Sequence, residues 1–459
     1  MKKIVQIGIG AIVISSTAMA KETSKQQMPP NILFFLADDC TFRDIACYGS
    51  PDAITPRIDN FAKEGMLFTQ CFQAVAMSSP TRTNIYTGLY PVKSGAYPNH
   101  TFVKEGVQSI VQFLKPRGYN TALLGKKHIN PKSAFPFNDL GDNGDELDFG
   151  KMNSYISDQK RKNEPFCLFV CSHQPHAPYT HGDPKRFPED KIKLPPYLVD
   201  TKVTRKELSK ILAEIEYMDG EFGQCLDMLE KYGLSENTVV VFASEQGNGM
   251  PFSKWTCYGN GLQSALIARW PGKIKPGKVS NAMVEYCDIT PTFIDIAGLA
   301  SRKELDGKSF LPVLLGKTNK HKEYVYGIQT TRGVIGCPTY YGSRTVRSNK
   351  FRYILNLTPE EPFVISNTSG TLIKSWQEKA QNDKNAGFLA GKYLKRPAEE
   401  LYDVVKDPFE LNNLANNPKY AIPMNELKTK LSEWMKQQGD KGQETELDAY
   451  NHQTKNMKE

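Results

Sequence analysis

The sequence predicts an α/β fold in which a mainly parallel sheet lies between two layers of helices, followed by a smaller second subdomain. Short runs that are apolar at nearly every position alternate with longer helical patterns, as expected for parallel strands buried on both faces. The chain has 459 residues, whereas one hydrophobic core stops growing at roughly 250–300 residues. The length therefore predicts one large domain and one smaller one.

Four apolar runs are the strand candidates, and they cover residues 31–37, 121–124, 166–171 and 238–243. Three segments have the helical spacing of apolar residues, namely 56–64, 107–115 and 205–232. After about residue 320 the pattern changes to short apolar runs and turns, among them 351–355, followed by an amphipathic helix near 424–436. This last part predicts a small antiparallel sheet with a helix.

Polar residues follow all four strand candidates. The clusters are Asp38-Asp39, Gly125-Lys126-Lys127-His128, His173-Gln174-Pro175-His176 and Glu245-Gln246. Ligand sites of open α/β sheets lie outside the carboxyl ends of the strands. The four clusters therefore predict one shared crevice.

The segment 78–82 combines a hydroxyl, a proline and a guanidinium within about one turn. Pro80 suits the first position of a helix because it has no N–H to leave unpaired. Ser78 would then lie where free N–H groups and the helix dipole favour an anion, and Arg82 could bind two oxygens of a sulfate or phosphate. Taken alone, the segment favours an ordinary N-capped surface helix, so the rest of the chain decides between the two.

The same stretch resembles the signature of type I sulfatases, in which the first residue of Cys/Ser-x-Pro-x-Arg becomes formylglycine. In that family a Thr-Gly-x-Tyr-Pro turn follows, and Thr87-Gly88-Leu89-Tyr90-Pro91 matches it here. The resemblance implies an alkaline-phosphatase-like three-layer α/β/α sandwich over residues 21–320 and a smaller antiparallel-sheet subdomain over residues 321–459. With the family motifs Gly-Lys-x-His, Pro-His-x-Pro and Lys-Trp-Thr, it also implies six catalytic residues: Ser78, Arg82, Lys126, His128, His176 and Lys254.

The resemblance also implies a mechanism. A hydroxyl of the hydrated formylglycine attacks sulfur, while Arg82 and the two lysines hold the sulfate oxygens. His128 serves as the base, and His176 with Lys254 assists the leaving group. Because position 78 is serine, maturation would require the anaerobic sulfatase-maturating enzyme, which accepts serine.

Three further residues are candidates for contact with the substrate, namely His100, His173 and Arg344. Arg344 lies in the C-terminal part, which borders the substrate pocket in the family. An exposed surface strand is the alternative interpretation of the segment around Arg344.

Asp38 and Asp39 directly follow a buried strand candidate. Adjacent carboxylates repel each other unless a cation lies between them, and oxygen ligands suit calcium; a helix cap or solvated turn is the alternative. In the family such a pair binds calcium with an Asp and an Asn or His from a later strand end. Here Glu245 and Gln246 take those places, each one methylene longer than Asp or Asn. The resemblance thus implies a calcium site formed by Asp38, Asp39, Glu245, Gln246 and the formylglycine from Ser78.

Two stretches, 124–131 and 344–352, are closer to the heparan N-sulfatases (sulfamidases) than to the arylsulfatases. They predict a sulfated saccharide substrate, first of all glucosamine N-sulfate. An O-sulfate on another glycosaminoglycan or on a host or algal glycan is one alternative. An unmodified pseudo-sulfatase that only binds sulfated glycans is another. A phosphatase with two zinc ions is excluded because the crevice lacks enough His and Asp ligands.

The first 20 residues contain two lysines, a short apolar stretch and a small-residue end, Ala18-Met19-Ala20. They predict a signal peptide and an exported, periplasmic or secreted protein, rather than an anchoring helix. The formal net charge of +8 suits a polyanionic substrate only weakly, and no nucleic-acid partner or membrane anchor is predicted. The nine cysteines match no zinc pattern, so we expect mostly buried thiols with one or two disulfides.

Overall fold

The computed structural model describes residues 1, 28–334, 336–337 and 340–457. Apart from Met1, the predicted signal peptide lies outside these residues. Within them, no helix has the length and apolar character needed to cross a membrane.

In the described part of the chain the main sheet has nine strands, in the order β4-β3-β5-β1-β6-β7-β2-β8, with β9 beside β2. Strands β3, β5, β1 and β6 are parallel neighbours, whereas β7 is antiparallel to both strands beside it. The strands are β1 (Asn31–Cys40), β2 (Met66–Phe72), β3 (Asn120–Gly125), β4 (Asn138–Gly141), β5 (Phe166–Cys171), β6 (Thr238–Gln246), β7 (Gln263–Arg269), β8 (Lys278–Ser280) and β9 (Val284–Glu285).

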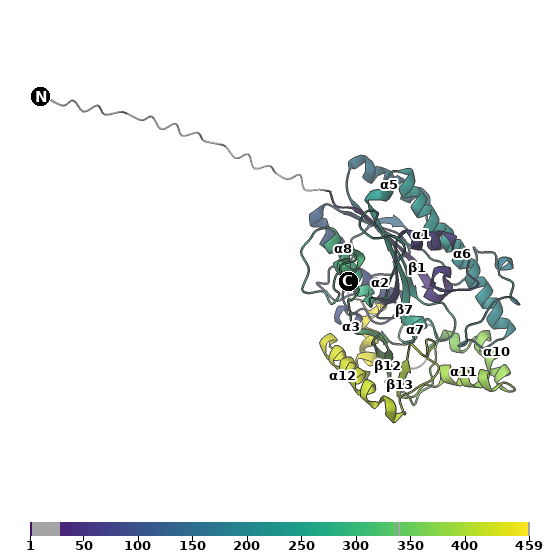
Figure 1. Ribbon diagram of the computed structural model, residues 1–459. Coiled ribbons are helices and arrows are strands. Elements are labelled where there is room, and N and C mark those ends of the chain that lie inside the picture. The colour runs from purple at the N-terminus through teal and green to yellow at the C-terminus, as the bar shows by residue number, and fades with distance from the viewer. Residues whose placement is uncertain (2–27, 335, 338–339, 458–459) are drawn as a thin grey trace.

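Helices cover both faces of this sheet, which Figure 1 shows nearly edge-on. One layer contains α1 (Pro56–Glu64), α5 (Phe149–Lys162) and α6 (Lys202–Lys231), and the other contains α2 (Ser78–Thr87), α4 (Ile110–Leu114) and α8 (Ile289–Ile296). Alternate residues of β1 serve the two layers, because Leu33 and Phe35 join one apolar core and Ile32 and Phe34 join the other. Burial on both faces explains why this strand is apolar at successive positions, and the three-layer prediction is confirmed.

The observed bounds differ from the predicted ones in ways that have local causes. β1 and β6 continue three residues beyond the apolar runs, into Asp38-Asp39 and Glu245-Gln246, and Cys40 pairs with Gln246. The predicted helix 107–115 is reduced to α4. It starts after the capping residue Ser109 and ends at Leu114, where a short 3-10 turn, Lys115–Arg117, follows. Pro116 has no N–H with which to continue the α-helical hydrogen bonds.

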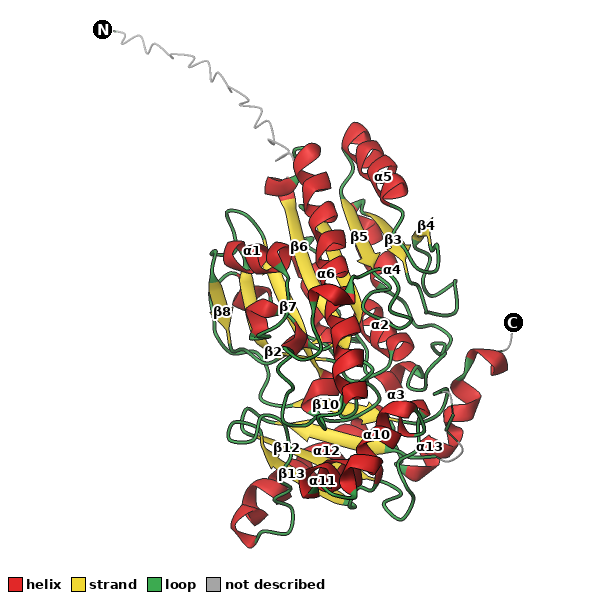
Figure 2. Ribbon diagram, turned by 90° about the vertical axis from the view of Figure 1, so that its right-hand side faces the viewer, coloured by secondary structure: helices red, strands yellow, loops and turns green. Residues whose placement is uncertain are grey.

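A second, antiparallel sheet of four strands forms the C-terminal subdomain, as predicted, and it lies below the main sheet in Figure 2. Its strands are β10 (Val325–Gln329), β11 (Ser343–Arg347), β12 (Phe351–Asn356) and β13 (Glu399–Asp403). Its helices are α10 (Thr371–Ala380), α11 (Lys384–Leu394), α12 (Ala421–Gln438) and α13 (Gln443–Asp448), and the short helices α3 (Pro91–Ser94), α7 (Gly259–Leu262) and α9 (Leu311–Leu314) belong to the main domain. A parallel bridge between Val75 and Ile328 links the two parts just upstream of Ser78.

The cysteines all lie in the described residues, and all nine have free thiols. Seven of them are buried, while Cys47 and Cys337 are partly exposed. The expectation of one or two disulfides is therefore wrong. Most of these side chains pack instead as small apolar groups in the cores.

Candidate active site

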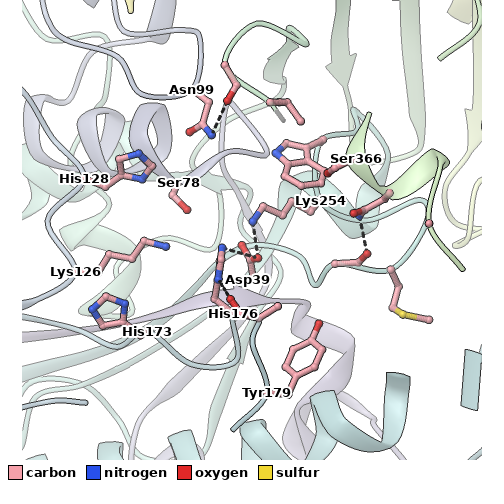
Figure 3. Close-up of a pocket in the computed structure, with 18 of the residues that line it drawn as sticks. Asp39, Ser78, Asn99, Lys126, His128, His173, His176, Tyr179, Lys254 and Ser366 are labelled. Atoms are coloured by element: carbon pink, nitrogen blue, oxygen red, sulfur yellow. Dashed lines mark hydrogen bonds and ion pairs between the residues drawn. The ribbon is translucent and has the colours of Figure 1, made fainter. Parts of the chain in front are cut away.

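A pocket of about 920 Å³ opens at the carboxyl ends of the parallel strands. Asp39 near the end of β1 and the polar residues that follow β3 and β5 line it, as do residues of the segment after β6. The residues that Figure 3 labels are Asp39, Ser78, Asn99, Lys126, His128, His173, His176, Tyr179, Lys254 and Ser366. The structure thus brings residues of three predicted clusters to one crevice, because the carboxyl ends of parallel neighbours share one edge of the sheet. Glu245 and Gln246, the fourth cluster, are buried behind the pocket, where Gln246 contacts Asp39 and Ser78.

Gly125 allows the chain to bring Lys126, Lys127 and His128 to this pocket. Its φ is +86°, and a Cβ at this position would lie 2.2 Å from the carbonyl oxygen of Cys171 on β5. Only glycine fits such a close approach in this conformation. The chain can therefore turn directly from β3 into Lys126.

Ser78 is the first residue of α2, and Pro80 is the third. The helix thus begins two residues earlier than predicted. Pro80 is still tolerated there because the N–H groups of the first turn have no partner within the helix. Ser78 is almost completely buried but lines the pocket, next to the free amides of the helix start.

Arg82 lies one turn further along α2 and is fully buried. Its Nη1 donates to the Lys126 carbonyl oxygen at 2.8 Å, and its Nη2 donates to Glu245 Oε1, also at 2.8 Å. Burial acts against its charge, but the Glu245 carboxylate raises the pKa of Arg82 above its usual value. Arg82 does not line the pocket, so its charge acts on the site through these partners.

The side-chain amide of Gln246 lies at the centre of an oxygen cluster. Its Nε2 donates to Asp39 Oδ1 at 2.6 Å, to Asp38 Oδ1 at 3.4 Å and to Ser78 Oγ. Ser78 Oγ also donates to Asp38 Oδ1 at 3.2 Å. Three oxygens thus converge on one positively polarised group, which is how oxygen ligands surround a divalent cation.

The opposite amide atom, Gln246 Oε1, is buried without a hydrogen-bond partner. Because the two ends of an amide have nearly the same shape, rotation would turn Oε1 into the cluster. Among the described residues, no group of three or more His, Cys, Asp or Glu side chains is arranged to hold a metal. A cation at this place would therefore use Gln246 and residue 78 as ligands beside Asp38 and Asp39.

Glu245 is placed less well as a ligand than the sequence implied. Its Oε1 accepts from Arg82, and its Oε2 is buried without a partner. Burial raises the pKa of Glu245 well above its usual value, although Arg82 opposes the shift. Glu245 thus serves mainly to hold Arg82.

A lysine neutralises each of the two aspartates. Lys126 Nζ pairs with Asp38 Oδ2, and Lys254 Nζ lies 2.5 Å from Asp39 Oδ2. Burial pushes the pKa of Asp38 upward, but the positive charges of Lys126 and His176 outweigh it, so the pKa lies well below the usual value. Asp38 is therefore ionised.

His128 and His100 form a pair, with His128 Nε2 3.0 Å from His100 Nδ1. Burial, followed by the positive charges of Lys126 and His100, lowers the pKa of His128 to about 3. Its imidazole is therefore neutral, and its Nδ1 is buried without a hydrogen-bond partner. Figure 3 shows it on the same side of the pocket as Ser78.

His176 and His173 line the pocket after β5. The side chain of His176 is 38% exposed; its Nδ1 donates to the Ala177 carbonyl oxygen at 2.5 Å, and its Nε2 lies 3.6 Å from Asp39 Oδ2. His173 Nε2 lies 2.8 Å from Asp142 Oδ1. The Nε2 atom of each histidine thus faces a carboxylate oxygen.

Arg344 does not reach the pocket. It lies on β11, is fully buried, and binds Asp440 through Nε and Nη2 and Glu446 through Nη1. Both sequence interpretations, a substrate contact and an exposed strand, are therefore wrong. Two acidic partners from the far C-terminal end draw the guanidinium inward.

Sequence reasoning missed several residues that line the pocket. Tyr179 and Trp255 adjoin the predicted motifs, so their position was a signal for them. Asn99 and Glu207 carry no such signal, nor does the segment 366–372 before and at the start of α10, of which five residues line the pocket. Their contribution depends on tertiary packing.

Comparison with known proteins decides the family. The family model described as Sulfatase matches residues 30–299, which is more than half of the chain. The chain belongs to the sulfatase family. It is therefore a hydrolase of sulfate esters, and a second model, N-sulphoglucosamine sulphohydrolase, C-terminal, matches residues 247–363.

Among its relatives, the sulfatase is 33% identical to an ulvan-active sulfatase of Formosa agariphila, over 93% of this chain and 84% of that protein. It is 28% identical to the N-sulphoglucosamine sulphohydrolase of Homo sapiens, over 88% of this chain and 90% of that protein. A solved structure in complex with its substrate D-glucosamine-2-N,6-O-disulfate has a TM-score of 0.68 at 22% identity, covering 90% of this chain and 99% of the other. This last likeness supports the fold alone.

Proposed function

We propose that this sulfatase removes sulfate from a sulfated carbohydrate, with residue 78 as the nucleophile after its oxidation to formylglycine. The observation that carries the proposal is the position of Ser78. Its hydroxyl contacts Asp38 and Gln246 within the oxygen cluster, beside the neutral imidazole of His128. A side chain held in this way has a negatively charged acceptor, a base and the start of α2 within one site.

Formylglycine would supply a hydrated aldehyde, of which one hydroxyl attacks sulfur and the other later allows sulfate to leave. The residues present fit a calcium ion, because Asp38, Asp39, Gln246 and residue 78 converge on one point and Gln246 Oε1 lacks a partner. A cation there would offset the charge of the sulfate oxygens.

The chain's own residues supply the remaining functions. The neutral ring of His128 accepts the proton of the attacking hydroxyl, and the negative charge of a bound sulfate would raise its pKa and strengthen it as a base. Lys126 and Lys254 line the pocket, and each holds one aspartate while presenting positive charge to the sulfate. His176 is the most exposed of these groups and donates a proton to the leaving group.

Our first candidate substrate is glucosamine N-sulfate at a saccharide end. It is supported by the match of residues 247–363 to the sulphohydrolase C-terminal model and by the human relative. Cleavage of an S–N bond releases an amine, which needs a proton more than an activated alcohol does. His176, near Asp39 and open to the pocket, is placed to supply it.

The second candidate is an O-sulfated polysaccharide. It is favoured by the higher identity of the ulvan-active relative, 33% against 28% for the human relative, and by its match to a larger share of this chain, 93% against 88%. The same nucleophile and cation site would serve both reactions, so the two candidates differ only in the leaving group and the sugar pocket.

Sulfate release from a panel of defined saccharides tests the proposal. The chain is produced without residues 1–20, together with an anaerobic sulfatase-maturating enzyme, and N-sulfated and 2-O-, 3-O-, 4-O- and 6-O-sulfated sugars are compared with an ulvan fragment. Release from glucosamine N-sulfate alone supports the first candidate, and release from O-sulfated sugars alone supports the second. No release from any sugar, with residue 78 shown to be oxidised, contradicts the proposal.

A further inference from the structure

The segment 247–262 between β6 and β7, a loop that ends in the short helix α7, carries Lys254, whose Nζ contacts Asp39. We call the whole segment the loop 247–262. Two aromatic residues close to Lys254 have positive φ angles, +66° at Phe252 and +64° at Trp255. Such angles are costly for bulky side chains, and they persist only where the surroundings hold the backbone in place. The position of Lys254 therefore depends on what packs against this loop.

The C-terminal subdomain holds the loop after Lys254 through two carboxylates. The hydroxyl of Tyr258 donates to Glu400 Oε2 at 2.8 Å, and the backbone N–H of Gly259 donates to Glu410 Oε2 at 2.7 Å. Both carboxylates are buried, so these charge-assisted bonds are stronger than they would be in water.

The same subdomain also holds the loop before Lys254. The Phe252 ring lies 5.1 Å from the ring of Tyr393 on α11 and 5.6 Å from that of Tyr258. Phe252 is buried, and aromatic pairs at such distances add to the energy of burial. The loop is thus gripped on both sides of Lys254 by a part of the chain that is remote in sequence.

Other contacts fix both carboxylates in turn. Glu410 Oε1 accepts from Arg352 Nε at 2.6 Å, and Glu410 itself has a φ of +58°. Glu400 Oε1 accepts from Asn356 Nδ2 at 2.9 Å. Arg352 and Asn356 both lie on β12, so the second sheet holds the two carboxylates that contact the loop.

The main domain ties the loop to the nucleophile segment. The backbone N–H of Trp255 donates to the carbonyl oxygen of Ala76, two residues before Ser78, at 3.1 Å. A displacement of the loop would therefore disturb Lys254 and the approach to residue 78 together.

We propose that Glu410, assisted by Glu400, is a positioning residue that holds Lys254 against Asp39 from the C-terminal subdomain. Neither glutamate lines the pocket, so the effect passes through the loop backbone. Only the kinetic test of this positioning role depends on the proposed sulfatase reaction, because hydrogen exchange of the loop 247–262 can be measured without a substrate.

Hydrogen exchange of the matured full-length enzyme is the first test. Glu410→Gln keeps the shape of the side chain but removes its charge, and amides of 247–262 should exchange about tenfold faster. The matched control is Glu446→Gln, which alters an equally buried carboxylate bonded to Arg344 rather than to the loop. This control should leave exchange in 247–262 unchanged.

Kinetics in two backgrounds are the second test. Glu410→Gln should lower kcat for sulfate release about 10–100-fold with little change in KM, and Glu410→Ala should lower it further. In a Lys254→Ala background the same substitution should change kcat by less than about threefold, because the residue it positions is gone. If Glu410→Gln acted through general destabilisation, it would lower kcat by the same factor in both backgrounds.

The positioning role is overturned if the amides of 247–262 exchange equally fast in the Glu410→Gln and Glu446→Gln enzymes. It is also overturned if Glu410→Gln lowers kcat as much in the Lys254→Ala background as in the unmutated enzyme. If the unmutated enzyme releases no sulfate from any sugar, the proposed function fails, and the exchange comparison alone decides the positioning role.

Discussion

Asp39→Asn is the most informative single substitution at this site. The Asp39 carboxylate contacts three groups, with Oδ1 accepting from Gln246 at 2.6 Å and Oδ2 lying 2.5 Å from Lys254 Nζ and 3.6 Å from His176 Nε2. Asparagine keeps the size of the side chain and removes its charge. The substitution therefore isolates the electrostatic role of the carboxylate.

Asp39→Asn should have two effects, one on the stability of the site and one on the rate of sulfate release. The Lys254 side chain, only 8% exposed, loses its ion-pair partner, and breaking a buried pair costs about 3–5 kcal/mol. We expect the lower end of this range because Lys254 borders the pocket. The proposed cation loses one of two charged ligands, and the loss of transition-state stabilisation should be about 4 kcal/mol, or about a thousandfold in kcat.

The assay measures sulfate release from the best sugar of the panel at increasing calcium concentrations, together with unfolding with and without calcium. Asp39→Asn should shift the calcium midpoint upward at least tenfold and reduce the stabilisation by calcium, which follows from mass action. The control is Asp158→Asn, which breaks an exposed Asp–Arg pair outside the pocket lining. An Asp39→Asn enzyme with unchanged kcat and calcium midpoint would refute the cation site and the role of the carboxylate.

Four further outcomes are expected. The peptide containing residue 78 should become about 2 Da lighter after co-expression with the maturating enzyme, through loss of two hydrogens; full activity at unchanged mass would contradict the nucleophile assignment. His176→Ala should lower turnover of glucosamine N-sulfate at least about tenfold more than turnover of an activated aryl sulfate, and equal losses would remove His176 as the proton donor. Arg344→Met should lower the free energy of unfolding by about 3–5 kcal/mol, because it leaves Asp440 and Glu446 buried without their partner. A changed KM at unchanged stability would show instead that Arg344 contacts the substrate. Burial raises the pKa of Glu221 from 4.5 to about 7, so between these pH values the folded state binds a proton that the unfolded state has lost. Protonated Glu221 therefore contributes fully to the free energy of unfolding below about pH 4.5, and this contribution falls by about 1.4 kcal/mol per pH unit until it is lost near pH 7. In urea titrations Glu221→Gln should flatten this decline of stability with pH, and an unchanged slope would contradict the raised pKa.

Much of the fold could be predicted because its signals are local. Burial on both faces makes each parallel strand a continuous apolar run, so 166–171 coincides with β5 and 238–243 lies within β6. The crevice was predictable for a related reason, since the polar residues after such strands must meet at one edge of the sheet. Motif residues such as Lys126 and His176 lie within a few positions of those strand ends, and no long-range packing is needed to bring them to the pocket.

Side-chain pairings across long separations were not predictable. Arg344 meets Asp440 across 96 positions, and nothing near either residue distinguishes an inward from an outward strand face. Likewise, Arg82 contacts Glu245 across 163 positions rather than facing the pocket, because a buried guanidinium needs a carboxylate that only the folded sheet supplies.

The sequence by itself determined the family, the strands that form the crevice and the residue types gathered there, since these follow from periodicity and short motifs. Tertiary structure alone decided which charges pair and what holds the loop of Lys254. Glu410 illustrates the difference, because its bond to Gly259 spans 151 positions. The physical reason is that strand and helix patterns are set by neighbours along the chain, whereas the partner of a buried charge is set by whichever segment packing brings within hydrogen-bond distance.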